Sequence, residues 1–300
     1  MLKIAHSPIY AHPLPEGHRF PMLKYELIPE QLLYEGSIQS DHLFVPSICS
    51  AEDILLTHEA DYYQRLINQQ LSPSEQRVIG FPQSPELIQR ELMITQGTID
   101  CALFALENGC AMNVAGGTHH AFAERGEGFC LLNDMAVAAN CLLQRKLVNK
   151  VLIIDLDVHQ GNGTAKIMEN VPEVFTFSVH GKNNYPFRKE QSDLDIGLED
   201  GTSGKEYLAM LNSVLPELMD QVEPDFVFYL AGVDVLATDK LGKFQLSLEE
   251  CKQRDKVVLD LVHQNRIPVA IALGGGYSPD IKDIVEAHGN TFRLALDLYD

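Results

Sequence analysis

The segment Asp155-Leu156-Asp157-Val158-His159 carries two carboxylates and an imidazole at alternate positions of the chain. It follows the apolar run 151–154, and side chains alternate sides along an extended chain. The three polar groups are therefore expected on one side of the chain, at the end of a buried strand. Carboxylates in such a place are costly unless they are paired or bind a metal. We therefore predict a metal site here, in preference to acids that merely cap the following helix.

A third ligand must come from another part of the chain, and Asp234 is the best candidate. It follows the apolar run 226–230 and the short stretch Ala231-Gly232-Val233. Two carboxylates and one imidazole that leave a coordination position open are typical of a catalytic rather than a structural site. Zinc is the preferred ion, although oxygen-rich ligation also suits ferrous iron or manganese.

Two adjacent histidines, His119 and His120, follow the pair Gly116-Gly117. Neighbouring side chains on an extended segment point apart, so a bend at the glycines is needed to bring both imidazoles to one site. Beside a metal, one imidazole can take a proton from a water activated by the ion and later protonate an amine leaving group. Each imidazole also needs an orienting partner. Asp155 and Asn162 are available for that role.

The segment Gly274-Gly275-Gly276-Tyr277 ends another apolar run and presents a phenol. The ring could simply pack in the core with its hydroxyl satisfied. If it faces the metal, the hydroxyl becomes a donor to the oxyanion of a tetrahedral intermediate.

Alternating strand and helix signals are expected to position these groups. Short apolar runs of buried-strand type occur at 110–115, 151–154, 174–179, 226–230 and 269–273, and helical segments at 85–108, 133–147, 204–221, 247–264 and 280–297. This order predicts a three-layer αβα fold with a mainly parallel central sheet. Ligands in such folds bind at the carboxyl ends of the strands, where each polar motif lies, His180 included. The first 80 residues are expected to wrap the sheet and build one rim of the site.

Composition narrows the class of protein. The 300 residues include 42 acidic and 23 basic side chains, a net charge of −19, which disfavours nucleic acid and anionic membranes as partners. No apolar stretch is long enough to span a membrane, and no signal peptide is recognisable. The six cysteines form no CxxC pair, which is typical of a reducing compartment. We expect a cytoplasmic protein with a single domain spanning 1–300, and no pattern indicates an oligomeric state.

Six motifs also carry a family resemblance. They are His18-Arg19-Phe20-Pro21-Met22, Gly116-Gly117-Thr118-His119-His120, Gly126-Glu127-Gly128-Phe129-Cys130 with Asn133-Asp134, residues 155–163, Ala231-Gly232-Val233-Asp234 and Gly274-Gly275-Gly276-Tyr277. In this order, over nearly the whole chain, they resemble the histone deacetylase superfamily, zinc-dependent enzymes of the arginase/deacetylase fold. The closest similarity is to the class IV branch, which includes histone deacetylase 11 and bacterial relatives.

The resemblance implies a role for each matching residue. Asp157, His159 and Asp234 would bind zinc. His120 would be the general base and acid, with His119 as its electrostatic partner tied to Asp155. Further matching residues would act on the substrate or on a second ion: Tyr277 would polarise the acyl carbonyl, Gly128 would accept from the substrate amide, Phe129 would line a tunnel, and Asp155, Ser178 and Val179 would bind potassium.

Two positions depart from some relatives. Asn162 stands where others carry Asp, and a neutral amide stabilises an imidazolium less, so His120 should have a lower pKa here. The loop Gly80-Phe81-Pro82-Gln83 lacks an acidic residue that clamps the peptide backbone in some relatives. Peptide recognition should therefore differ, and the tunnel could admit acyl groups longer than acetyl.

The function expected from these patterns is zinc-dependent hydrolysis of N-acyl amines, with an acyl-lysine side chain as the first candidate substrate. An acetylpolyamine amidohydrolase shares the chemistry and would exploit the acidic surface. A binuclear manganese ureohydrolase is less consistent, because the segment around Asp234 offers only one carboxylate. A non-catalytic acyl-lysine binder or scaffold is the alternative from a different class.

Overall fold

A single sheet of eight strands forms the centre of the computed structural model, which describes residues 1–300. The strand order is β2-β1-β3-β8-β7-β4-β5-β6, and every neighbouring pair is parallel. The strands are β1 (Lys3–Ala5), β2 (Leu43–Phe44), β3 (Cys110–Asn113), β4 (Val151–Asp155), β5 (Val174–Gly181), β6 (Leu194–Leu198), β7 (Phe226–Leu230) and β8 (Val269–Ala272). The predicted three-layer αβα fold is confirmed.

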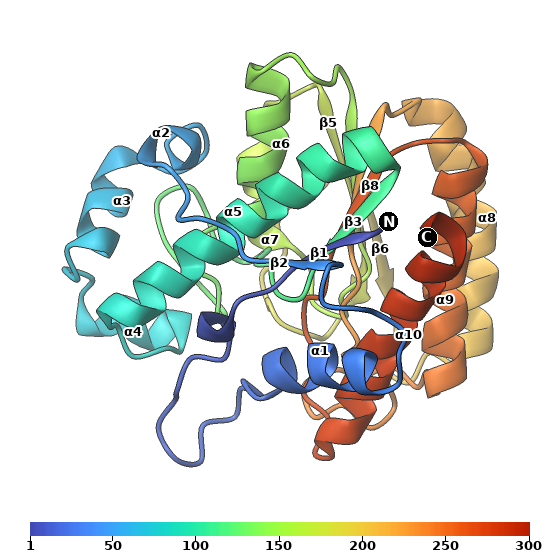
Figure 1. The fold of residues 1–300 in the computed structure, drawn as a ribbon, viewed down its shortest axis with the longest axis horizontal. Helices are drawn as coiled ribbons and strands as arrows, with labels where there is room; N and C mark the ends of the chain where they lie inside the picture. The colour runs from blue at the N-terminus through green and yellow to red at the C-terminus, as the bar shows by residue number, and fades with distance from the viewer.

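Helices cover both faces of the sheet (Figure 1). α5 and α6 lie on one face, whereas α8, α9 and α10 lie on the other, with α1 packed against α10. The helices are α1 (Lys24–Tyr34), α2 (Ala51–Ile54), α3 (Ala60–Ile67), α4 (Pro73–Ile79), α5 (Pro85–Asn108), α6 (Asp134–Gln144), α7 (Asn162–Met168), α8 (Gly204–Val222), α9 (Leu248–Gln264) and α10 (Ile281–Tyr299), with a 3₁₀ turn at Pro8–Tyr10. No helix is long and apolar enough to cross a membrane.

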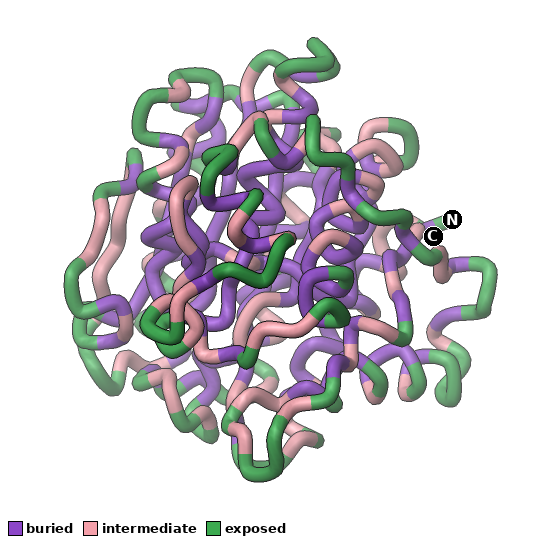
Figure 2. Tube along the Cα trace, turned by 90° about the vertical axis from the view of Figure 1, so that its left-hand side faces the viewer, coloured by how far each residue is buried: buried purple, intermediate pink, exposed green.

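The central strands owe their position to uninterrupted apolar sequence. β4 reads VLIID and β7 reads FVFYL, and every residue of both strands is buried. Strands covered on both faces need apolar side chains at all positions, not at alternate ones. Figure 2 shows the result, with buried stretches gathered in the middle of the molecule and exposed stretches at the outer turns.

Local sequence signals set the ends of the longer helices. At the start of α5 the Ser84 hydroxyl accepts a hydrogen bond from the Leu87 amide, and Pro85 occupies the first turn. Gly109 ends the same helix with a φ of +87°. α8 and α9 each begin with a Ser-x-x-Glu capping box, which satisfies two amide groups at the helix start.

The segments predicted from apolar periodicity all form within a few residues of the expected bounds. Residues 1–80 do more than wrap the sheet, however, because β1 and β2 extend it beyond β3. β6 was also not expected, since its residues are only half-buried and include an aspartate and a glycine. Short edge strands bury little apolar surface, so their sequence carries a weak pattern.

Candidate active site

Asp157, His159 and Asp234 meet beyond the carboxyl ends of the neighbouring strands β4 and β7. Their ligand atoms all lie within 4.8 Å of one another, and all three residues are buried. His159 Nδ1 is 3.0 Å from Asp157 Oδ1 and 3.0 Å from Asp234 Oδ2. One nitrogen and two oxygens therefore face a common point.

Backbone amides hold the outer oxygens of both carboxylates. The Gly275 amide donates to Asp157 Oδ2 at 2.8 Å, and the Val158 amide donates to Asp234 Oδ1 at 2.9 Å. A Cβ at Gly275 would lie 2.1 Å from Asp234 Oδ2, so only glycine permits this approach. These bonds orient the inner oxygens toward His159, as outer partners of metal ligands do.

The electrostatics of this group favour a cation. Burial and the nearby charge of Asp157 raise the pKa of Asp234 to about 7. Burial would lower the pKa of His159, but hydrogen bonds to Asp157 and Asp234 outweigh it and raise that pKa to about 10. Two buried carboxylates thus need a positive charge between them, and a proton on His159 is one source. A divalent ion fits the same donor set, since two oxygens and one imidazole nitrogen suit zinc.

His119 and His120 lie beside this group, with ring centroids 4.1 Å apart. The chain bends before them at Gly116 and Gly117, whose φ values are +83° and +74°. The two rings have different partners: His119 Nδ1 lies 2.7 Å from Asp155 Oδ2, whereas His120 Nδ1 lies 2.7 Å from Asn162 Oδ1.

The pKa values of the two imidazoles are shifted in opposite directions. Burial alone would lower the pKa of His119, but the carboxylates of Asp155 and Asp157 outweigh it and raise that pKa. Burial and the neighbouring imidazoles His119 and His159 lower the pKa of His120 well below its ordinary value. His119 is suited to remain protonated near neutral pH, and His120 is suited to accept a proton.

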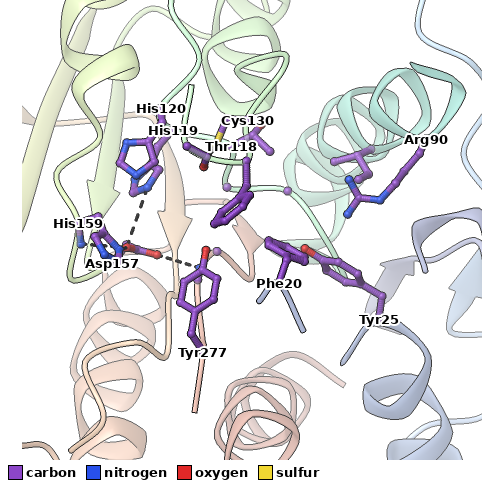
Figure 3. A pocket seen from close by; sticks show the side chains of 17 residues that line it. Phe20, Tyr25, Arg90, Thr118, His119, His120, Cys130, Asp157, His159 and Tyr277 are labelled. Carbon is purple, nitrogen blue, oxygen red and sulfur yellow. Dashed lines mark hydrogen bonds and ion pairs between the residues drawn. The ribbon is translucent and has the colours of Figure 1, made fainter. Parts of the chain in front are cut away.

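Aromatic rings line the pocket leading to these groups. Figure 3 shows Tyr277 and the histidine pair reaching the pocket from opposite sides, with the Tyr277 hydroxyl directed into it. The Tyr277 ring lies 6.0 Å from Phe20, 6.1 Å from Phe129 and 6.4 Å from His159, between ring centroids. Burial raises the pKa of Tyr277 well above its usual range, so the phenol keeps its proton and can donate it in a hydrogen bond.

A tight turn at Gly128 and Phe129 forms another part of the pocket wall. Both residues have positive φ, +54° and +68°, which is strained for a phenylalanine. Their amides donate to the carbonyls of Val78 and Ile79, at the end of α4. The Gly128 carbonyl accepts a weak hydrogen bond from the thiol of Cys130 at 3.4 Å. Residues 1–80 thus contribute to the rim of the pocket, as α4 anchors this turn.

The residues assigned to potassium lie on the neighbouring strands β4 and β5. Asp155 at the end of β4 is the register partner of Ser178 in β5, and Val179 follows in the same strand. Both Asp155 oxygens are engaged, by His119 and by the Asp157 amide at 3.1 Å. The Ser178 hydroxyl lies 3.0 Å from His180 Nδ1. Side chains alone do not form a cation site here, so main-chain carbonyls would have to supply ligands.

Sequence reasoning missed the buried cations around the pocket, Arg90 in its lining among them. Lys24 is another. Its side chain is fully buried, and its Nζ donates to the Gly274 carbonyl at 2.8 Å. Burial lowers its pKa to about 8, against the attraction of Asp234 and Asp157. The lysine begins α1, two residues after the segment His18–Met22, and nothing in its local sequence distinguishes it from an exposed residue.

Fold and site together define an αβα protein with a candidate metal centre at the carboxyl ends of its central strands. The protein-family model described as the histone deacetylase domain matches residues 18–292 of this chain. An uncharacterised protein of Picosynechococcus sp. is 45% identical over 99% of both chains. Histone deacetylase 2 of Arabidopsis thaliana is 30% identical, covering 87% of this chain and 70% of its own length.

A solved structure agrees with these sequence matches. The crystal structure of a histone deacetylase homologue complexed with SAHA superimposes with a TM-score of 0.82 at 25% identity, covering 97% of this chain and 82% of the other. The chain belongs to the histone deacetylase family. The assignment to its class IV branch stays a prediction.

Proposed function

We propose that this protein hydrolyses N-acyl amines, with an acyl-lysine side chain as substrate and one divalent ion, zinc by preference, as cofactor. The observation that carries the proposal is the convergence of a buried Asp-His-Asp donor set and two adjacent histidines with different hydrogen-bond partners on one pocket. Membership of the histone deacetylase family supports the same chemistry. We propose further that residues 1–300 act as one catalytic domain.

The donor set Asp157, His159 and Asp234 would hold the ion. When bound, a divalent ion polarises the acyl carbonyl and lowers the pKa of the attacking water. His120 would take the proton of that water as the carbon–oxygen bond forms, and would return it to the amine nitrogen as the carbon–nitrogen bond breaks. A protonated His119, paired with Asp155, would stabilise the negative charge that develops on the acyl oxygen side of the pocket.

Other groups of the pocket would orient the substrate. Tyr277, protonated because of its raised pKa, would donate a hydrogen bond to the oxyanion. The Gly128 carbonyl would accept from the substrate amide, and Phe129 would pack along the acyl-bearing chain. Asp155, Ser178 and Val179, with nearby carbonyls, would hold a structural potassium ion.

The charge at the pocket mouth bears on the choice of substrate. A cavity of about 390 Å³ opens from His120 and Tyr277 toward solvent, and its walls include Arg19 and Lys243 but no carboxylate. Lys243 is paired with Asp200 at 3.2 Å, whereas the Arg19 guanidinium lies over the Phe129 ring, 5.0 Å from its centroid. The pocket entrance is therefore not acidic, although the whole chain has a net charge of −19. A polyamine would gain no ion pair there, which ranks the acetylpolyamine amidohydrolase second and the non-catalytic binder third.

Replacing Tyr277 by Phe tests the assigned chemistry. Loss of one oxyanion donor should lower kcat on an acetyl-lysine peptide by about 10² to 10³-fold, while metal content stays unchanged. Tyr34→Phe is the matched control, because that tyrosine, the last residue of α1, is 95% exposed and does not line the pocket. Unchanged turnover in the Tyr277 variant would contradict the role.

A substrate panel tests the substrate class. Metal-loaded protein should turn over acetyl-lysine or longer-chain acyl-lysine peptides faster than acetylputrescine. The opposite order would favour the polyamine alternative, and no hydrolysis of any member would favour the binder.

A further inference from the structure

Glu127 lies beside the catalytic pocket but belongs to neither the donor set nor the histidine pair. Its Oε1 accepts a hydrogen bond from Asn162 Nδ2 at 3.2 Å and another from the hydroxyl of Tyr185. The Glu127 side chain is 15% exposed, so these bonds form largely out of water. A continuous chain of hydrogen bonds thus runs from Tyr185 through Glu127 and Asn162 to His120.

The carboxylate determines which way the Asn162 amide faces. A carboxylate oxygen can only accept, so the atom of Asn162 nearest to Glu127 must be its NH₂ group. The amide oxygen then faces His120 Nδ1 at 2.7 Å. Because that oxygen can also only accept, the neutral His120 ring must carry its proton on Nδ1. Nε2 is then free to accept a proton.

Two separate segments hold Glu127 and Tyr185 in place. The Glu127 and Cys130 backbones exchange two hydrogen bonds of 2.9 Å, which close the tight turn between them. Lys189 Nζ donates to the carbonyls of Asn184 and Pro186, at 2.7 and 2.5 Å, on either side of Tyr185. The Tyr185 ring also stands edge-on to His120, at 5.0 Å between centroids and 88°.

We propose that Glu127, supported by Tyr185, is a positioning residue that sets the tautomer of His120 through Asn162. This inference rests on the proposed function, in which His120 Nε2 accepts the proton of the attacking water. Without Glu127, the Asn162 amide can rotate and present its NH₂ group to His120 Nδ1. The ring would then keep its proton on Nε2, where it could not act as the base.

The same geometry gives a reason for an amide at position 162. An aspartate there would lie about as close to Glu127 as the present 3.2 Å contact, and two adjacent carboxylates repel. With Asn162, the negative charge stands one hydrogen bond further from His120. The Glu127 carboxylate therefore fixes the orientation of the Asn162 amide. It raises the pKa of His120 less than an aspartate bonded directly to the ring would.

Kinetics of metal-loaded variants test the proposal. Glu127→Ala should lower kcat by about tenfold or more with KM within about twofold, because the base is misprotonated while substrate contacts remain. Tyr185→Phe should lower kcat by about threefold, since the carboxylate keeps its bond to Asn162. Glu124→Ala is the matched control: this glutamate lies three residues away, is 44% exposed and pairs with Arg125, which also lies 3.6 Å from Glu127 Oε2, so the variant perturbs that ion pair without removing the hydrogen bond to Asn162. It should leave kcat unchanged.

A rescue experiment separates tautomer control from simple support of the turn. Asn162→Asp added to Glu127→Ala should restore at least half of the lost activity on a logarithmic scale, because an aspartate offers His120 only acceptors in either orientation. A glutamate that only stabilises the turn would not be rescued by a change at position 162. Failure of this rescue, or a Glu127→Ala variant as active as Glu124→Ala, would overturn the proposal.

Nitrogen-15 spectra of histidine-labelled protein test it without any substrate. His120, assigned by comparison with a His120→Ala variant, should show Nδ1 as the protonated nitrogen, and Glu127→Ala should shift it toward the Nε2–H form. An Nε2–H signal in the parent protein would overturn the inference. If no acyl substrate is hydrolysed but the tautomer still depends on Glu127, the proposed function fails and the relay stands.

Discussion

His119 and His120 are neighbours in sequence and in space, yet their pKa values are shifted in opposite directions. Their rings are 4.1 Å apart and both are buried. The pKa of His119 is raised because Asp155 and Asp157 outweigh the effect of burial. The pKa of His120 is lowered because burial and the imidazoles of His119 and His159 outweigh the hydrogen bond to Asn162 and the charge of Asp157. Because the two rings are chemically identical, the difference in their pKa values comes from their surroundings, and the hydrogen-bond partner of each ring indicates its role.

The partners come from different elements, which keeps the two roles apart. Asp155 is the last residue of β4, and Asn162 is the first residue of α7. The short bend between them passes through the metal donors Asp157 and His159. One strand-to-helix connection thus supplies two donors and both orienting groups. Displacing it would disturb the metal centre and the histidine pair together.

The largest expected effect comes from removing one histidine at a time. His120→Ala should lower kcat by about 10² to 10⁴-fold, since the general base and acid is lost. His119→Ala should cost about tenfold, because that ring contributes charge and position but moves no proton. Steady-state kinetics on an acetyl-lysine peptide, with metal content measured in each variant, provide the comparison.

Equal losses in the two variants, with metal retained, would break the distinction between the histidines. A larger loss in His119→Ala would reverse the roles. His263 is a control site whose replacement by Ala should leave kcat unchanged, because it lies in the last turn of α9, packs its ring against Tyr299 and does not line the pocket.

The next effect concerns pH dependence. Activity should require His120 unprotonated, which places its acidic limb below the ordinary histidine range, and His119 protonated, which places the alkaline limb above it. Asp155→Asn removes the carboxylate that raises the pKa of His119, so the alkaline limb should move to lower pH by about one unit. The acidic limb should stay in place, because Asp155 does not contact His120.

Profiles of kcat/KM against pH for the parent protein and the Asp155 variant check this expectation. A shift of the acidic limb alone would mean that Asp155 acts on the pKa of His120 and not on that of His119, which would contradict the account.

The smallest expected effect is the number of protons released when the metal binds. This number should depend on the donor set and not on His120. His159 has a pKa of about 10 and Asp234 of about 7, so both give up protons to a bound ion. At pH 7 about one and a half protons should be released, falling to about one at pH 9, where Asp234 is already ionised. Metal affinity should rise with pH until His159 itself loses its proton.

Isothermal titration of zinc in buffers of different ionisation enthalpy gives this proton count. Replacing His120 by Ala should leave it unchanged, since that ring is outside the donor set. A count near zero at pH 7 would mean that His159 does not bind the ion.

Much of the fold and site is readable from sequence because the signals are local. The all-apolar run before Asp155 predicts a buried strand, and the alternation Asp155, Asp157, His159 predicts polar groups at its end. Asp234 follows an equally clear strand, and the structure brings its carboxylate to His159. Parallel strands end at one edge, so independent local patterns are sufficient to gather these residues.

Other contacts depend on long-range packing that leaves no local pattern. Lys24 and Gly274 are 250 positions apart, and Glu127 and Tyr185 are 58 apart. Their pairing depends on how α1 and the loop before β6 settle on the finished sheet. The resemblance to a family placed Glu127 within a motif, but only the three-dimensional contact with Asn162 shows what its carboxylate touches.

The most direct test of the account is a titration of activity against zinc. Metal-free protein should be inactive on an acyl-lysine peptide, and activity should rise linearly with added zinc to a break at one equivalent per chain. An Asp234→Asn variant should lose this tight, single break. Full activity in the presence of a strong chelator, or a break at two equivalents as a binuclear centre requires, would contradict the claim that one ion held by Asp157, His159 and Asp234 supports catalysis.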